Sequence, residues 1–225
     1  MIRRVYHGSD HRIESPLFGA GKPYNDYGLG FYCTEVPDMA REWAVDLDRD
    51  GYVNAYDIDC AGLRILDLGS PEFTVLHWLA VLLENRTFNA TSPLAAEAKA
   101  YLVDRFLPPY RDRDVVIGYR ADDSYFSFAQ DFINGAISVR QLGNAMRLGR
   151  LGEQFVIKSE PAFERLSFVS AERASAEVWY PRKSERDRAA RRAYFDAERS
   201  RRQKGDLYIV QILDEEVAPD DPRLR

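Results

Sequence analysis

The chain has 225 residues, 45% of them hydrophobic and 12% aromatic, which suits one domain with a substantial core. Two cysteines exclude a disulfide framework, three histidines give no cluster with metal-ligand spacing, and no run of about 18 apolar residues is present that could cross a bilayer, so we expect no structural metal and no membrane contact. The net charge of −5 conceals a basic stretch at 182–204, where ten Arg or Lys stand against four Asp or Glu.

The first predicted strand lies almost at the start of the chain, without the apolar core of a signal peptide, so we expect a cytoplasmic protein. Short segments rich in β-branched or aromatic residues predict strands at 2–6, 30–33, 51–58, 63–68, 114–118, 154–158, 165–169 and 206–213. Apolar periodicity and capping residues predict helices at 38–47, 71–84, 94–106, 126–133, 139–148 and 184–202. This order lacks the alternation of a doubly wound sheet, so we predict the α+β class.

The first strand ends in a motif suited to binding, Val-Tyr-His-Gly-Ser at 5–9. The ring nitrogens of His7 can donate and accept hydrogen bonds, and Gly8 allows a ligand to approach the backbone. Taken alone, His7 could also be a turn histidine with a satisfied hydrogen bond. The motif is therefore informative only together with the next one.

The second motif places two glycines, Gly28 and Gly30, just before the aromatic Tyr32, and Trp43 follows on the predicted helix 38–47. The glycines permit unusual backbone angles, and they could equally form a simple turn. Trp43 has helical spacing and could be a core residue. If Tyr32 and Trp43 face each other, the gap between them fits a pyridinium ring such as nicotinamide, because its positive charge attracts aromatic faces.

With these motifs in this order, the chain resembles the ADP-ribosyltransferase superfamily, in the histidine-tyrosine-glutamate branch that includes diphtheria-like toxins and the poly(ADP-ribose) polymerases. It resembles more closely an uncharacterised family of small bacterial proteins in that superfamily, often encoded beside small partners in toxin and antitoxin style. The likeness covers most of residues 5–170. Its further motifs are Trp78-Leu79, Asn85-Arg86, Val116-Ile117-Gly118, Ala121-Asp122-Asp123 and the segment from Glu153 to Lys158.

The resemblance implies an ADP-ribosyltransferase-like split β-sandwich with flanking helices, which holds a nucleotide in the cleft between two sheets. This domain would span 1–170, with a basic helix and a strand in 171–225 packed on it. The implied substrate is NAD, used without a metal. The implied partners are a macromolecular acceptor of ADP-ribose and an antitoxin-like protein.

The resemblance also implies roles for the candidate residues. His7 would contact a hydroxyl of the adenosine-side ribose, and the Gly8 backbone would contact the nicotinamide carboxamide, with a further hydrogen bond from Ser9. Tyr32 and Trp43 would cover the two faces of the nicotinamide ring. These residues, together with the two glycines of the second motif, form the expected NAD site.

The third catalytic position departs from the family pattern, because alignment places Gln154 where the catalytic glutamate usually stands. Glu153 is no obvious replacement, since neighbouring strand residues point to opposite faces. Gly152 stands where arginine-directed transferases have an acid, which makes arginine a poor guess for the acceptor. Two hypotheses follow: a transferase with the triad His7, Tyr32 and Gln154, or an NAD-binding module that has lost turnover and acts as a sensor or partner-binding protein.

Two further features allow both a structural and a functional interpretation. Asp122 and Asp123 follow a predicted strand and could contact substrate or cap the next segment. The basic stretch 182–204 could bind nucleic acid through phosphate contacts and make it the acceptor. Its alternating charges are also typical of a solvated helix face, which is the interpretation that we favour.

Overall fold

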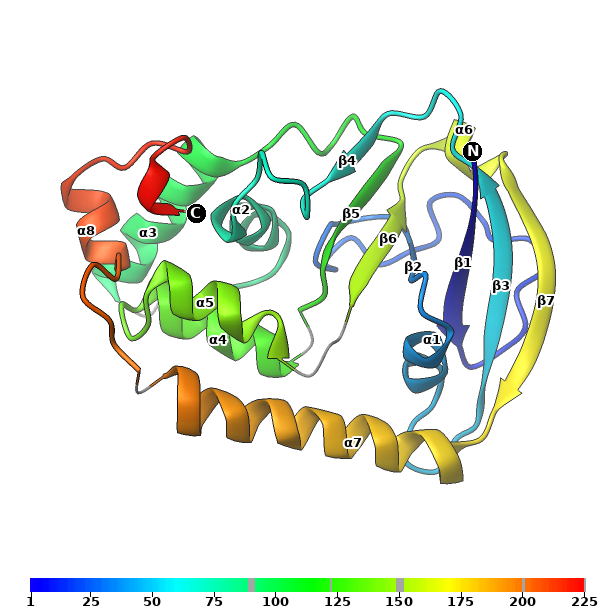
Figure 1. The fold of residues 1–225 in the computed structure, drawn as a ribbon. Coiled ribbons are helices and arrows are strands. Elements are labelled where there is room, and N and C mark those ends of the chain that lie inside the picture. Colours follow the sequence, from blue (N-terminus) through cyan, green and yellow to red (C-terminus); the bar gives the residue numbers. More distant parts are fainter. Residues whose placement is uncertain (89–91, 122, 149–151, 200, 225) are drawn as a thin grey trace.

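Two β-sheets lie beside each other on one side of the molecule in this computed structural model, which describes residues 1–88, 92–121, 123–148, 152–199 and 201–224 (Figure 1). The first sheet is antiparallel, in the order β1 (Ile2–Ser9), β3 (Gly51–Asp59) and β7 (Leu166–Ala174). The second sheet has the order β2 (Phe31–Cys33), β6 (Glu153–Ile157), β5 (Val115–Tyr119) and β4 (Ile65–Asp67). In it β4 and β5 run parallel, and the other neighbours run antiparallel.

The two sheets are joined where β1 passes the end of β2. The Tyr6 amide donates to the Thr34 carbonyl oxygen at 2.8 Å, and the Thr34 amide donates to the Tyr6 carbonyl oxygen at 2.9 Å. A small apolar cluster that draws on both sheets, including Val5, Ile58 and Phe155, fills the space on one side of this junction. The junction therefore fixes β1 and β2 side by side, with the His7 and Tyr32 positions next to each other.

Helices surround the second sheet and one end of the first (Figure 1). α1 (Pro37–Ala44) packs on β1 and β3. A helical body beside the second sheet contains α2 (Val75–Asn85), α3 (Pro93–Phe106), α4 (Asp123–Ile133), α5 (Val139–Ala145) and α8 (Ile209–Asp214). The short α6 (Glu160–Phe163) precedes β7, and a 3-10 turn, Pro222–Leu224, lies near the end of the chain.

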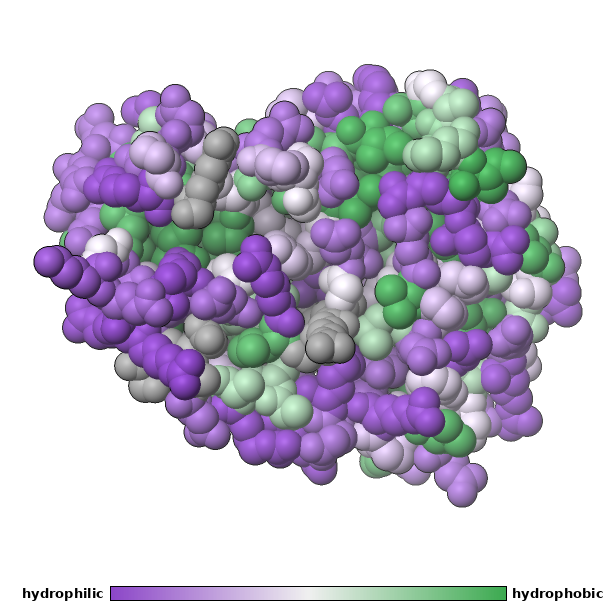
Figure 2. All heavy atoms as spheres, viewed as in Figure 1, coloured by the Kyte–Doolittle hydropathy of each residue, from purple (hydrophilic) through white to green (hydrophobic). Residues whose placement is uncertain are grey.

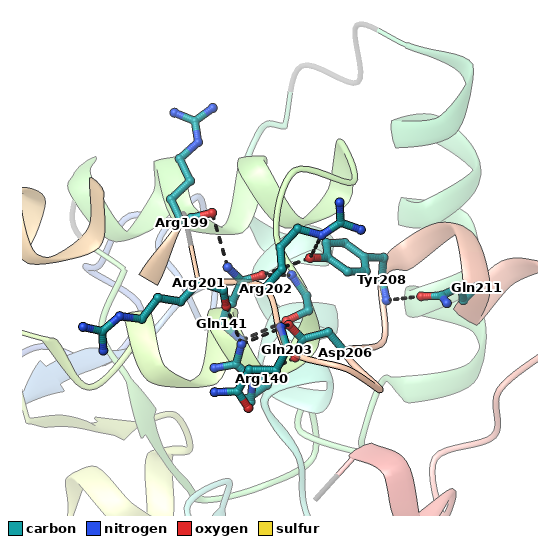
Figure 3. A network of polar contacts seen from close by, with 10 residues as sticks. Arg140, Gln141, Arg199, Arg201, Arg202, Gln203, Asp206, Tyr208 and Gln211 are labelled. Carbon is teal, nitrogen blue, oxygen red and sulfur yellow. Dashed lines mark hydrogen bonds and ion pairs between the residues drawn. The ribbon is translucent and has the colours of Figure 1, made fainter. Parts of the chain in front are cut away.

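The long helix α7 (Ala176–Ala193) runs from the first sheet to the helical body and continues as a π-helical turn, Tyr194–Glu198 (Figure 1). At its far end the Tyr194 ring stacks on Phe128 of α4 at 3.9 Å. The segment that follows is held by polar contacts: Arg140 binds both carboxylate oxygens of Asp206, at 2.7 and 3.0 Å, and the Arg201 carbonyl oxygen at 2.8 Å (Figure 3). Residues beyond 170 thus share the main core.

The predicted α+β class is confirmed. The first seven predicted strands match β1 to β7 within a few residues, but the predicted strand 206–213 is wrong. This segment forms α8, because the Tyr208 amide is capped by Gln211 Oε1 at 2.8 Å and Ile209 and Ile212 bury one helical face.

The expected division at 170 falls inside β7, which pairs with β3, so it is not a boundary in the fold. The predicted helix 184–202 begins earlier than expected, at Ala176, and runs through Pro181. Its start is capped from a distant loop, since the Ala176 amide donates to Asp50 Oδ1 at 2.7 Å. A cap that comes from another part of the chain leaves no local signal in the sequence.

Candidate functional site

A cavity of about 430 Å³ lies where the junction of the sheets meets α1 and α7. Its wall draws on β1, β2, β6 and α1, on the loop before β2, on the segments after α2 and β5, and on α7. The lining residues are His7, Gly8, Asn25, Asp26, Tyr32, Trp43, Arg86, Arg120, Ala121, Gln154 and Lys183. The cavity therefore brings together residues from almost the whole length of the chain.

His7 is anchored through one of its two ring nitrogens. Its Nδ1 lies 2.7 Å from the Tyr32 carbonyl oxygen, and its ring packs on Phe31 with the centroids 4.4 Å apart. Burial lowers the pKa of His7 below its ordinary value, which the hydrogen bond to Tyr32 only partly offsets. In a neutral ring Nδ1 must carry the proton, because a carbonyl oxygen only accepts. Nε2 is then an acceptor, suited to a ligand hydroxyl.

Gly8 allows α1 to lie directly against β1. A Cβ atom at this position would stand 2.2 Å from the Ala40 carbonyl oxygen and 2.8 Å from the Ala44 nitrogen. The absence of a side chain therefore serves the packing of the helix, and Gly8 also lines the cavity, so the approach by ligand that the sequence motif predicted stays a prediction. This packing carries Trp43, which α1 bears, to the wall of the cavity beside Gly8.

Tyr32 is fixed by its hydroxyl group. The hydroxyl donates to the Gly28 carbonyl oxygen at 2.6 Å and accepts from the Tyr27 amide at 3.0 Å. Burial raises the pKa of the Tyr32 hydroxyl above its ordinary value. Gly28 has a φ of +74°, a left-handed conformation that glycine adopts without strain. The loop of the second motif thus positions the Tyr32 ring. A Cβ atom on Gly30 would stand 2.7 Å from Val156 Cγ1, so this glycine is needed for packing against β6.

Trp43 presents both a face and a polar atom. The Arg120 guanidinium carbon lies 4.5 Å from the centre of its ring, so a cation already stacks on the indole. Its Nε1 is buried and has no hydrogen-bond partner in the described parts of the chain. Tyr32 and Trp43 line the same cavity, as the sequence predicts, but with Arg120 on the indole the ring pair is not an open slot.

Gln154 is nearly fully buried on β6, opposite Gly118 of β5. Its Nε2 donates to Asp26 Oδ2 at 3.3 Å, and its Oε1 is buried without a partner among the described residues. Asp26 also accepts from the Ala121 amide at 2.9 Å, and its Oδ1 lies 3.5 Å from an Arg86 nitrogen. The cavity therefore contains a carboxylate, but on a loop and not at the strand position of the usual glutamate.

Sequence reasoning missed several charged residues of the wall. Asp26 lies in a long loop without a recognisable pattern, and Arg120 follows a strand with no motif of its own. Arg86 belongs to one of the motifs of resemblance but was given no role, and Lys183 was counted only as part of the basic stretch. The described residues of the wall include three cations and one carboxylate, a positive balance that favours an anionic ligand.

A larger neighbouring cavity, of about 930 Å³, shares His7, Gly8, Asn25, Tyr32, Trp43 and Arg120 with the first. It continues along the loop 11–22, where Lys22 adds positive charge and Arg12 is paired with Glu14 at 2.9 Å, and it includes Gly30. Small-molecule sites commonly measure about 300–1,000 Å³. Together the two cavities have room for a ligand as large as a dinucleotide.

Several predicted site residues are not among the described residues that line the smaller cavity. Ser9 is one of them, and its hydroxyl donates to the His11 carbonyl oxygen and accepts from Asn54 Nδ2 at 3.1 Å. Gly28 and Gly30 are also not among the described residues of this wall, although Gly30 lines the larger cavity. Asp123 begins α4, and Asp122 lies outside the described residues.

Three arginines of the basic stretch form ion pairs with acids. Arg186 binds the buried Glu42 of α1, Arg191 binds Asp187 at 3.0 Å, and Arg192 binds Glu185 at 2.8 Å. Figure 2 shows mostly hydrophilic residues along the lower edge of the molecule, where α7 runs in Figure 1. The pairing is typical of a solvated helix face, with Lys183 as the member that lines the cavity.

Within the described ranges, no three His, Cys, Asp or Glu side chains group closely enough to hold a metal ion. The same ranges contain no helix that is long and apolar enough to span a membrane.

The fold and the cavity define an α+β protein with two small sheets and a positively lined binding cavity beside their junction. A family model described as a protein of unknown function, DUF3990, matches residues 3–168, and the chain belongs to this family. No curated protein and no solved structure matches the chain. The matched region ends inside β7, so α7 with Lys183 lies beyond it.

Proposed function

We propose that this protein is an NAD-dependent ADP-ribosyltransferase, with the two sheets forming the split β-sandwich of that superfamily. The supporting observation is that His7, Tyr32, Trp43 and Gln154, which the resemblance selects from distant parts of the sequence, line one cavity. Such convergence is unexpected for residues with unrelated structural roles. The enzyme cleaves the bond between nicotinamide and ribose and transfers ADP-ribose to a macromolecule.

The polar groups of the wall suit the parts of NAD. His7 Nε2 is an acceptor for a ribose hydroxyl, and the unpartnered Trp43 Nε1 is a donor for a ligand oxygen. Arg86, Arg120 and Lys183 attract the pyrophosphate. Nicotinamide stacks against Tyr32 and Trp43, and Arg120 moves from the indole face as the ring enters.

The reaction requires stabilisation of positive charge on the ribose. The bond from the nicotinamide nitrogen to the ribose carbon breaks, its electron pair leaves with neutral nicotinamide, and the acceptor nucleophile adds to the ribosyl cation and loses a proton. Gln154 can orient the ribose through Oε1 but carries no negative charge. Loss of one well-placed electrostatic group costs on the order of 100- to 1,000-fold in rate, so turnover is expected to be slow.

The chain resembles a family of small bacterial proteins that are often encoded beside small partners in toxin and antitoxin style. This resemblance also suggests a biological role. Slow transfer to a cellular macromolecule suits a toxin-type effector in the cytoplasm, restrained by an antitoxin-like partner. The neutral Gln154 favours a second candidate function, in which the protein binds NAD in the same cavity without turnover and acts as a sensor or as a partner-binding protein.

Incubation of the protein with labelled NAD and a cell lysate separates these functions. The proposal predicts that nicotinamide is released and that label is transferred, and that both signals fall in the Gln154→Ala variant. NAD binding without release or transfer would support the sensor, and absence of binding at millimolar NAD would refute both.

A further inference from the structure

The orientation of the Gln154 amide is determined by its neighbour Asp26. The two side chains are nearly fully buried, and Gln154 Nε2 donates to Asp26 Oδ2 at 3.3 Å. An ionised carboxylate can only accept hydrogen bonds, so the amino end of the amide must face it. The other end, Oε1, is consequently left as an acceptor with no partner in the described ranges.

Asp26 is itself held from two other parts of the fold. Its Oδ2 accepts from the Ala121 amide at 2.9 Å, and its Oδ1 lies 3.5 Å from Arg86 Nη1. These contacts come from the segment after β5 and from the end of α2, so the carboxylate is fixed independently of Gln154. Both Asp26 and Gln154 line the cavity. The pair is therefore ordered before any ligand enters.

We infer that Asp26 is the positioning residue of this site and compensates for the glutamine at position 154. It turns the Gln154 amide so that Oε1 can accept a hydrogen bond from a ligand hydroxyl. Because Nε2 donates to a carboxylate, the amide is polarised and Oε1 carries more negative charge than in an isolated amide. For the identity of the ligand the inference rests on the proposed function, in which the nicotinamide-side ribose supplies the hydroxyl.

The same contact explains why a glutamine suits this position. A glutamate at 154 would bring a second carboxylate to within hydrogen-bond distance of Asp26, and two carboxylates that close repel each other when both are ionised. Gln154→Glu alone should therefore weaken ligand binding at about pH 8 and recover it at lower pH, when the two groups share a proton. With Asp26→Asn in the same chain, the asparagine Nδ2 can donate to the glutamate, although the Ala121 amide then loses the oxygen to which it donates.

The test is calorimetric titration of NAD into the wild-type chain, Asp26→Asn, Gln154→Glu and the double variant. We expect Asp26→Asn and Gln154→Glu each to weaken binding about tenfold at about pH 8, and the double variant to bind NAD more tightly than either single variant. Asp114→Asn is the matched control, because Asp114 is also a buried carboxylate, bound to Arg64, but lies outside the cavity wall given by the described residues. Its NAD affinity should be unchanged.

The inference is overturned if Asp26→Asn binds NAD as wild type does, or if the double variant binds no better than Asp26→Asn. A ligand-free readout is the nuclear magnetic resonance signal of the Gln154 side-chain amide, which should shift in Asp26→Asn and stay in place in Asp114→Asn. An unshifted signal in Asp26→Asn also overturns it. A wild-type chain that binds no NAD refutes the proposed function, while the amide signal still decides whether Asp26 orients Gln154.

Discussion

The Nδ1 atom of His7 lies 2.7 Å from the carbonyl oxygen of Tyr32. This contact links β1, an edge strand of the first sheet, to β2 of the second sheet. It fixes the imidazole in one tautomer at the wall of the cavity. Because burial lowers the pKa of His7, the ring is neutral at neutral pH. The consequences can be measured without knowledge of the ligand.

We predict that His7 titrates below its ordinary value of 6.5. The unfolded chain then binds a proton at higher pH than the folded one, so the stabilising contribution of the neutral ring is complete above pH 6.5 and is lost as the pH falls through the folded-state pKa. Nuclear magnetic resonance titration gives the pKa, and urea unfolding at several pH values gives the loss. A His7 pKa above 6.5 would contradict the assigned tautomer and burial.

Tyr32 allows the ring and the hydroxyl to be separated. Tyr32→Phe removes the bonds to the Gly28 carbonyl and the Tyr27 amide and should cost about 1 kcal/mol of stability, while the ring keeps its stacking. Tyr32→Ala also removes the ring and should weaken NAD binding about fivefold or more, corresponding to about 1 kcal/mol. Equal NAD affinity in the Ala and Phe variants would remove the ring from the site.

Gly8→Ala should displace α1 from β1. The added methyl group would meet the Ala40 carbonyl oxygen at 2.2 Å, and a backbone atom cannot turn aside, so we expect a loss of about 1–3 kcal/mol or more. Gly143→Ala is the matched control, since a methyl group there meets no atom of the described residues within 4 Å outside its own stretch of helix, and alanine favours the helix. Thermal unfolding of both variants checks the prediction, which fails if Gly8→Ala is as stable as wild type.

The contact between α7 and α1 depends on a buried ion pair. Arg186 Nε donates to Glu42 Oε2 at 2.8 Å, and Arg186→Gln would leave the buried Glu42 carboxylate without its cation. We expect a loss of about 3 kcal/mol in urea unfolding. Arg192→Gln, which breaks an exposed pair with Glu185, should change stability little. Similar losses in the two variants would show that burial does not distinguish the pairs.

The pairing of the basic stretch also bears on nucleic acid. With Arg186, Arg191 and Arg192 bound to carboxylates, we expect at most weak binding of the protein to DNA or RNA at physiological salt. Electrophoretic mobility at several salt concentrations measures it. Tight binding that weakens steeply as salt rises would instead support an acceptor docked on α7.

Local patterns predicted most strands and the cluster of His7, Tyr32 and Trp43, because each depends on neighbouring residues or on the register of short motifs. The errors arose where contacts with distant parts of the chain determine the secondary structure. The helix from Ala176 begins through a cap supplied by Asp50, and the predicted strand at 206–213 became α8 through its packing on the helical body.

The charged residues of the cavity were missed for the same reason. Asp26, Arg120 and Lys183 come from a loop, a strand end and a helix that the fold brings together, and nothing in their local sequence distinguishes them. Gln154, in contrast, was found because a strand motif placed it. Its hydrogen bond to Asp26 could be seen only in the structure.

A crystal structure of the protein with bound NAD would show directly whether the cavity is an NAD site. We expect nicotinamide to lie against Tyr32 and Trp43 beside Gly8, with Arg120 moved from the indole. Gln154 Oε1 should accept a hydrogen bond from a ribose hydroxyl. A dinucleotide bound elsewhere, or a cavity that stays closed by Arg120 at saturating NAD, would contradict this prediction.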